Sequence, residues 1–218
     1  MFSKFQIFRC LANPVFVRLY SAQTINLIGD ALTWLGLALL AFEIAGDNAG
    51  VILSGALTLR VLAYVVLSPL AGAIADRTDR KWLMVLTHLM RMGLICLFPF
   101  VTQPWQIYGI VLALSVFSAF FVPTYTATIP LVVDSSQYPQ AIALSSATYQ
   151  ILGVLGPGIA GSVAALVGTR QIFFLDALTF LVSALLIVSL PGKLRVPQAE
   201  RKTESRCLWP DLQAGTLC

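Results

Sequence analysis

The sequence predicts an all-α membrane protein, and three observations carry this prediction. Hydrophobic side chains make up 58% of the 218 residues and charged side chains only 11%, whereas a soluble domain usually carries about a quarter charged residues. The mean hydropathy of +0.84 comes from apolar runs that recur along the whole chain. Runs such as 61–67 lack the alternation of apolar and polar residues that a membrane β-strand requires.

Apolar windows long enough to cross a membrane follow one another along the chain. A spanning helix needs about 20 mostly apolar residues, and windows of that kind lie at 17–42, 51–75, 82–101, 105–122, 141–167 and 172–190. Charged residues close the first two, at Glu43 and Asp76. Pro104 separates the third from the fourth, Pro123 closes the fourth, and Arg170 separates the last two. The sequence therefore predicts about six transmembrane helices.

These windows divide the chain into two parts. Residues 1–190 are expected to form the transmembrane bundle, and residues 191–218, which have no seventh apolar window, a truncated cytoplasmic linker or tail. The stretch 121–130 contains Pro123 and Pro130, and we expect it to break the fourth helix at its inner end.

The distribution of basic residues predicts the orientation, because Lys and Arg stay on the cytoplasmic side. They gather before the first window, between the second and third, and after the sixth, as Lys4, Arg9, Arg18, Arg77, Arg80, Lys81, Lys193, Arg195, Arg201, Lys202 and Arg206. The opposite connections carry Glu43 and Asp47, then no charge at 102–104, then Arg170. We expect a multi-pass protein of the inner (plasma) membrane with both termini in the cytoplasm.

Charge and cysteine content limit the partners. The formal net charge of +4 lies in short clusters between apolar runs and forms no basic face with interleaved aromatics. The lipid bilayer, and not nucleic acid, is therefore the expected partner of these charges. The four cysteines, Cys10, Cys96, Cys207 and Cys218, show no metal-ligand spacing. We expect no metal and no other cofactor.

Residues 72–81 read Gly-Ala-Ile-Ala-Asp-Arg-Thr-Asp-Arg-Lys and follow the second window. They resemble the signature loop of the major facilitator superfamily, which has Gly, three variable residues, Asp-Arg, a variable residue, Gly, Arg and a basic residue. The matching positions are Gly72, Asp76, Arg77, Arg80 and Lys81, and Asp79 replaces the second Gly. The resemblance implies a conformational latch in which Asp76 accepts hydrogen bonds. From the residues alone, these side chains enforce topology and bind lipid head groups.

The fifth window contains Gly153, Gly156, Pro157 and Gly161, which resemble the superfamily's antiporter motif. Leu152 and Ala160 stand where the family pattern has Gly. At helical spacing the small residues form two adjacent stripes, one with Gly156, Ala160 and Ala164 and one with Gly153, Pro157, Gly161 and Ala165. Another helix can approach such stripes closely, so close packing alone is the alternative to an antiporter role.

The resemblance covers the chain to about residue 190 and implies the N-terminal six-helix half of a major facilitator fold, a 3+3 inverted repeat. An offset of 89 residues, which matches Gly72 and Lys81 to Gly161 and Arg170, fits such a repeat. The drug- and siderophore-exporting branch, with its enterobactin exporter-like and macrolide efflux-like proteins, is the most similar. The resemblance implies proton-coupled efflux of a small hydrophobic or chelating substrate, without enzyme activity. It also implies a partner, either a C-terminal six-helix half (same gene or separate) or a second copy in a homodimer.

A polar stripe crosses the first window. Its members share one helix face by spacings of three and four residues and are Gln23, Asn26, Asp30, Thr33 and Trp34. Ionisable residues inside a membrane are costly and are expected to face a cavity or a partner. Asp30 lies near the centre of the first window and Arg60 near the centre of the second. The stripe is expected to line the transport path, with Asp30 either carrying a coupling proton or forming a permanent ion pair with Arg60.

Structural roles are expected for the remaining intramembrane polar residues, Arg91, Asp176 and His88, with Asp176 within reach of water. Two other functions stay open. Asp76 and Asp79 are three residues apart, as in a membrane-embedded Mg-dependent phosphotransferase, but basic residues crowd the pair and the further acidic clusters of such an enzyme are missing. The chain is alternatively an inactive truncated fragment.

Overall fold

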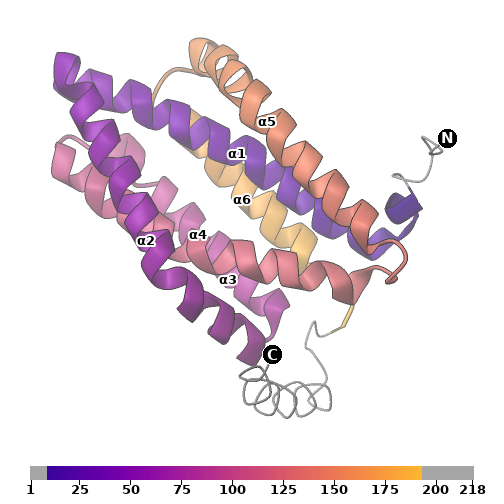
Figure 1. Ribbon diagram of the computed structural model, residues 1–218. Coiled ribbons are helices and arrows are strands. Elements are labelled where there is room, and N and C mark those ends of the chain that lie inside the picture. The colour runs from indigo at the N-terminus through magenta and orange to yellow at the C-terminus, as the bar shows by residue number, and fades with distance from the viewer. Residues whose placement is uncertain (1–8, 193–218) are drawn as a thin grey trace, which may run out of the picture.

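The computed structural model describes residues 9–192, which form helices and contain no strand. The elements are η1 (Arg9–Ala12), α1 (Pro14–Ala45), η2 (Gly46–Asn48), α2 (Ala49–Arg77), α3 (Arg80–Ile95), η3 (Phe98–Phe100), α4 (Pro104–Val132), α5 (Tyr138–Val167) and α6 (Ile172–Val188). The long helices lie side by side in one bundle (Figure 1). The all-α prediction is confirmed, and the predicted tail lies outside the described residues from 193 onward.

Capping residues explain where several helices begin. Asn13 precedes α1, its side chain accepts from the backbone N–H of Val15 at 2.9 Å and of Phe16 at 3.4 Å, and Pro14 takes the first helical position. Asp79 caps α3 in the same way and accepts from the backbone N–H of Lys81 at 3.1 Å. Asp79, which stands where the family pattern has Gly, is therefore the last residue of the α2–α3 connection and the N-cap of α3.

The lengths of the helices fit a bilayer. In the described part of the chain, four helical runs are long and apolar enough to cross a membrane, and the first of them, 14–75, contains α1 and most of α2. α1 ends and the chain turns at Gly46, whose positive φ of 53° favours glycine. α6 is a shorter apolar helix of 17 residues, which at about 1.5 Å per residue still approaches the roughly 30 Å of a hydrocarbon core.

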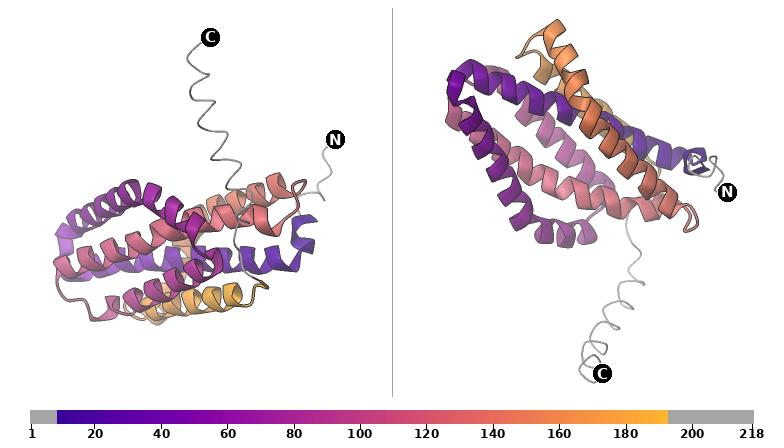
Figure 2. Two further views of the ribbon diagram at one scale, coloured as in Figure 1. Left: turned by 90° about the horizontal axis from the view of Figure 1, so that it is seen from below. Right: turned by 45° about the horizontal axis from the view of Figure 1, so that its top comes forward.

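The neighbours of each helix show a two-fold exchange between the first three helices and the last three. α1 packs against α5 and α6, and α4 packs correspondingly against α2 and α3, while α3 and α6 pack against each other. Exchanging α1 with α4, α2 with α5 and α3 with α6 therefore reproduces the main contacts. α1 and α4 run in opposite directions (Figures 1 and 2), as a 3+3 inverted repeat requires.

Two basic residues related by the 89-residue offset make equivalent contacts at opposite ends of the bundle. Lys81, at the start of α3, donates from Nζ to the carbonyl of Leu190 after α6, at 2.5 Å. Arg170, before α6, donates from a guanidinium nitrogen to the carbonyl of Pro99 after α3, at 2.7 Å. Each cation binds a carbonyl just after a helix C-terminus, where positive charge is favourable. Arg170 also pairs with Glu43 at 2.9 Å.

The predicted break in the fourth helix is wrong. α4 continues to Val132 and contains both Pro123 and Pro130. Thr124 and Thr128 in this stretch donate their hydroxyls to carbonyls four residues earlier, at 2.6 and 2.7 Å. These hydroxyls bond to carbonyls next to those that the prolines free. Membrane helices tolerate proline because neighbouring helices, hydroxyls and local adjustments of the backbone satisfy the freed groups.

Candidate functional site

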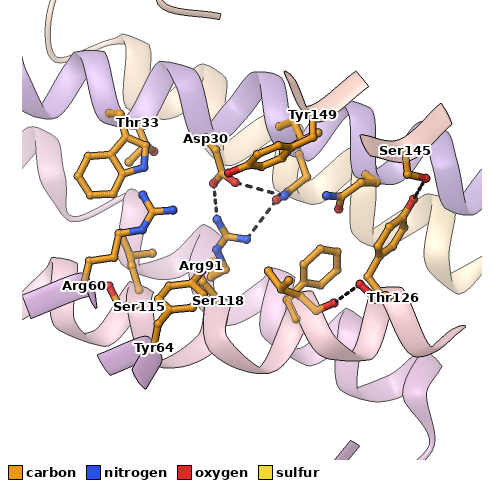
Figure 3. Close-up of a pocket in the computed structure, with 18 of the residues that line it drawn as sticks. Asp30, Thr33, Arg60, Tyr64, Arg91, Ser115, Ser118, Thr126, Ser145 and Tyr149 are labelled. Carbon is orange, nitrogen blue, oxygen red and sulfur yellow. Dashed lines mark hydrogen bonds and ion pairs between the residues drawn. The ribbon is translucent and has the colours of Figure 1, made fainter. Parts of the chain in front are cut away.

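A cavity of about 670 Å³ lies between α1, α2, α4 and α5. α2 and α5 lie on opposite sides of the bundle (Figure 2), and residues of both line the cavity together with residues of α1 and α4. α3 contributes Arg91 and Ile95. The close-up in Figure 3 shows polar side chains from these helices that point into the same space. An apolar cavity with a few convergent polar groups is the usual form of a small-molecule site.

Asp30 and Arg91 form an ion pair at the cavity wall (Figure 3). Arg91 also donates to the side-chain oxygen of Asn26 at 3.2 Å, and the Asn26 amide donates to the second oxygen of Asp30 at 3.4 Å. The Arg91 guanidinium lies over the ring of Phe180 at 4.2 Å. The Asp30 side chain is 31% exposed and that of Arg91 only 6%. The carboxylate is therefore the part of the pair that a ligand or a water molecule can reach.

The alternative that paired Asp30 permanently with Arg60 is wrong. Arg60 stacks instead over the ring of Trp34, at 4.5 Å, and near the ring of Tyr64, at 5.7 Å. Arg91, which we had expected to be structural, occupies the position beside Asp30. The sequence does not show which arginine pairs with Asp30, because the apolar pattern does not give the order of helices around the bundle.

The five residues of the polar stripe on α1 all line the cavity, as their spacing predicts. Asn26 and Thr33 are buried, whereas Gln23, Asp30 and Trp34 are partly exposed. The side-chain oxygen of Gln23 is buried and has no hydrogen-bond partner among the described residues. A buried acceptor without a partner is costly, so this oxygen is available to a donor in the cavity.

Asp176 lies behind this stripe, between α6 and α1, and the expectation that it contacts water is wrong. It has no exposed surface, because α1 covers it. Thr33 donates to one of its oxygens and Thr179 to the other, the latter at 3.0 Å. A Cβ atom at Gly29 would collide with Asp176 and Thr179. Glycine at this position therefore allows α6 to approach α1.

The residues of the predicted latch loop contact helix ends. Arg80 is buried and donates to the carbonyl of Ala127 in α4, at 2.5 Å. Lys81 reaches the carbonyl after α6, as described above. Both side chains thus connect helices, a contact that the alternative of topology alone does not require. A Cβ atom at Gly72 would meet open space. The side chains of Asp76 and Arg77 lie outside the described part of the structure.

The two small-residue stripes on α5 differ in how much of them is buried among the described residues. Gly156, Ala160 and Ala164 are buried, and a Cβ atom at Gly156 would lie 2.8 Å from the Cβ atom of Ala31 in α1. The other stripe points outward, with Gly153, Pro157 and Ala165 exposed and Gly161 partly exposed. The predicted close approach of a second helix is therefore confirmed for the first stripe.

Sequence reasoning missed several residues of the cavity. Tyr149 and Ser145 on α5 line it, and Ser145 contacts the hydroxyl of Tyr125 on α4 at 3.2 Å. The two α5 residues are four apart, a spacing that places them on one helix face. A search of the fifth window for a polar stripe would have found them.

His88 is predicted to be a packed polar residue. It lies buried, with its ring against Phe121 and Phe180.

Comparisons with known proteins agree with this geometry. The family model described as Major Facilitator Superfamily matches residues 19–213. The uncharacterized MFS-type transporter YfiS of Bacillus subtilis is 28% identical over 201 residues, which cover 90% of this chain and 47% of that protein. Macrolide efflux protein A of Streptococcus pyogenes is 23% identical over 87% of this chain and 47% of its own length.

A third relative is named for staphyloferrin A and not for a macrolide. The staphyloferrin A transporter of Staphylococcus aureus is 27% identical over 64% of this chain and 37% of its own length. The chain thus spans about half the length of the curated relatives that it matches.

Proposed function

The chain belongs to the Major Facilitator Superfamily, and we propose that it supplies one six-helix wall of a transporter that exports small molecules in exchange for protons. As a member of this family it is a multi-pass membrane protein. The observation that carries the proposal is the cavity, in which the Asp30 carboxylate is partly exposed beside Arg91.

The proposed substrates are small hydrophobic or chelating compounds. Two relatives are named for a macrolide and for staphyloferrin A, which supports a drug or a siderophore as the transported class. The lining combines apolar surface with a few charged groups, a composition that suits such molecules. Membership of a transporter family favours transport over the phosphotransferase alternative.

The ion pair offers a way to couple protons to substrate. Asp30 holds Arg91 while it is ionised, and a proton on Asp30 would remove the charge that Arg91 binds. The guanidinium donors would then become available to another acceptor in the cavity. Substrate binding and protonation of Asp30 would in this way influence each other, which is the requirement for coupled exchange.

A second half completes the proposed transporter. In this fold the substrate site lies between two six-helix repeats that rock against each other, and this chain lines one side of such a site. The exposed stripe at Gly153, Pro157 and Ala165, together with exposed apolar residues on α5 such as Val154 and Leu166, is available to it. We propose a separate or covalently linked C-terminal half, or a second copy of this chain.

The substitution Asp30→Asn tests the proposal. Assayed with a second six-helix half, in vesicles with an imposed proton gradient and with a labelled macrolide and a labelled siderophore as probes, it should abolish proton-driven transport. Membrane insertion should remain, because one midplane carboxylate is not needed for topology. Asp134→Asn, at an exposed position in the α4–α5 connection, is the matched control. Unchanged proton-driven transport by Asp30→Asn would contradict the coupling role.

The presence of the partner is the second variable of the same experiment. Transport that requires the added half supports the two-half arrangement. Transport by this chain as a purified dimer supports the homodimer, and robust transport by a proven monomer would contradict the proposal of a half-transporter.

We further propose that the end of the bundle with Arg18, Arg80 and Lys81 faces the cytoplasm. Cysteine labelling tests this orientation in a chain whose native cysteines are replaced by serine. Thr78→Cys, in the α2–α3 connection, should react with a membrane-impermeant maleimide only after permeabilisation. Thr102→Cys, in the exposed α3–α4 connection, should react in intact cells. The reverse pattern would invert the orientation.

A further inference from the structure

Arg60 lines the cavity without a counter-ion among the described residues, because the other charged residues of the lining pair with each other. Asp30, Arg60 and Arg91 are the Asp and Arg residues that line the cavity. Asp30 and Arg91 neutralise each other. Among the side chains that the structure describes, no carboxylate lies at ion-pair distance from Arg60, and its guanidinium N–H groups have no protein acceptor. The wall of the cavity therefore carries a net positive charge.

The position of Arg60 along α2 makes this charge costly. It lies about 17 Å from Ala49, the nearer end of the helix, at about 1.5 Å per residue, and the hydrocarbon core is only about 30 Å thick. An extended arginine side chain does not reach the head groups over that distance, so snorkelling offers no solution. An arginine near the midplane is expected to face a cavity or a partner, and Arg60 faces this cavity.

Two aromatic rings hold the guanidinium in place. Its central carbon lies 4.5 Å from the ring centre of Trp34 on α1 and 5.7 Å from that of Tyr64 on α2. Cation–π contacts of this kind fix the group without neutralising it. A guanidinium has five N–H donors in a planar fork that matches a carboxylate, and the rings leave the hydrogen-bonding capacity of these donors unused.

We infer that Arg60, Trp34 and Tyr64 form a subsite for a small organic anion, such as a carboxylate on a planar or aromatic molecule. The inference rests on the proposed transport function and adds the charge class of the substrate. Among the two proposed classes it favours chelating compounds, because oxygen anions are the groups with which a chelator holds a hard metal ion. A cation would instead meet repulsion from Arg60.

Three anthracene probes whose head groups carry different charges test the subsite. They are anthracene carboxylate, the uncharged anthracene carboxamide and the cationic anthracenylmethylammonium. Anthracene absorbs where tryptophan emits, so energy transfer from Trp34 reports binding in a chain whose Trp82, Trp105 and Trp209 are replaced by phenylalanine. The chain is held in phosphatidylcholine nanodiscs near neutral pH, where the carboxylate is ionised.

The unsubstituted Arg60 form gives the first result. The carboxylate should bind about tenfold more tightly than the carboxamide and still more tightly than the ammonium, because a charge-assisted hydrogen bond is worth that much. Equal binding of all three would overturn the inference and leave the proposed function intact. Binding of none would count against the cavity as a substrate site, and hence against both.

Substitutions at Arg60 give the second result. Arg60→Gln should lose about tenfold in affinity for the carboxylate and keep its affinity for the carboxamide. Arg60→Lys keeps the charge and should retain the order of the three probes. Arg170→Gln removes one positive charge outside the cavity and should leave the affinities for the three probes unchanged. If Arg60→Gln fails to fold, the order of affinities in Arg60→Lys decides, and loss of the carboxylate preference there would overturn the inference.

Lipid is the other source of an anionic group. Added phosphatidylglycerol in the nanodiscs should leave carboxylate binding unchanged, because head groups do not reach the depth of Arg60. Competition by this lipid would assign Arg60 to lipid binding and overturn the inference.

Discussion

The carboxylates of Asp30 and Asp176 both lie where α1 meets a neighbouring helix, and they differ in access and in partners. Asp30 is 31% exposed, faces the cavity and pairs with Arg91. Asp176 has no exposed surface and accepts hydrogen bonds from Thr33 and Thr179. A group that exchanges protons with water or substrate must be reachable. The comparison therefore favours Asp30 for the proposed proton exchange, whereas Asp176 attaches α6 to α1.

One side chain connects the two regions. Thr33 lines the cavity with Asp30 and donates its hydroxyl to Asp176. The helix position of Thr33, three residues after Asp30, keeps both on neighbouring parts of one face. Gly29, one residue before Asp30, gives α6 the room to bring Asp176 to that hydroxyl. The same turn of α1 thus forms the cavity wall on one side and a helix contact on the other.

The substitution Asp176→Asn should produce the larger stability effect within this comparison. Its amide NH₂ replaces one acceptor oxygen, so the hydroxyl of Thr33 or Thr179 that donates to that oxygen must reorient. We expect a loss of about 1–2 kcal/mol in the free energy of unfolding, measured by denaturant titration in micelles. Proton-driven transport should persist, in contrast to Asp30→Asn.

Asp134→Asn is again the control, because Asp134 is exposed and its substitution should change stability by less than about 0.5 kcal/mol. Loss of proton coupling in Asp176→Asn, with stability unchanged, would contradict the division of roles between the two acids.

The sequence allowed the helical fold to be predicted, because a bilayer imposes long apolar windows that composition reveals directly. It also placed the polar stripe of α1 on one face, because three- and four-residue spacing within a single helix determines which side chains are neighbours. Both conclusions depend only on local order along the chain.

The partner of Asp30 could not be predicted in this way. Arg60 and Arg91 each lie well inside an apolar window, and the choice between them depends on which guanidinium points at Asp30 across the bundle. That order is a property of the assembled bundle. Pro123 and Pro130 led to the other main error, because the effect of a proline depends on whether nearby hydroxyls and helices satisfy the freed carbonyls.

The prediction that Asp176 lies within reach of water was wrong for a related reason. Its place near the end of the sixth window indicated contact with water, yet Gly29 on a distant part of the sequence allows α1 to cover it. Burial of a polar group by another helix leaves no periodic signal in the segment that carries the group.

The smallest predicted effect comes from Thr33→Val, which removes the hydroxyl shared by the two regions while keeping the shape of the side chain. Hydrogen bonds between membrane helices average about 0.6 kcal/mol, and we expect a loss of that size in the free energy of unfolding. Thr58→Val is the control, because the Thr58 hydroxyl donates only within α2, to the carbonyl of Ser54 at 2.8 Å. It should have a smaller effect.

A double-mutant cycle with Asp176→Asn then separates the two possible roles of Thr33. If its hydroxyl acts on Asp176, the cost of Thr33→Val should shrink by about 0.5 kcal/mol in the Asp176→Asn background, because contacting residues are not additive. If its hydroxyl acts on the cavity, the two costs should add, and Thr33→Val should instead raise the KM for the transported probe. Additive costs with an unchanged KM would show that the hydroxyl acts neither on Asp176 nor on the cavity. The two regions would then be linked by packing alone.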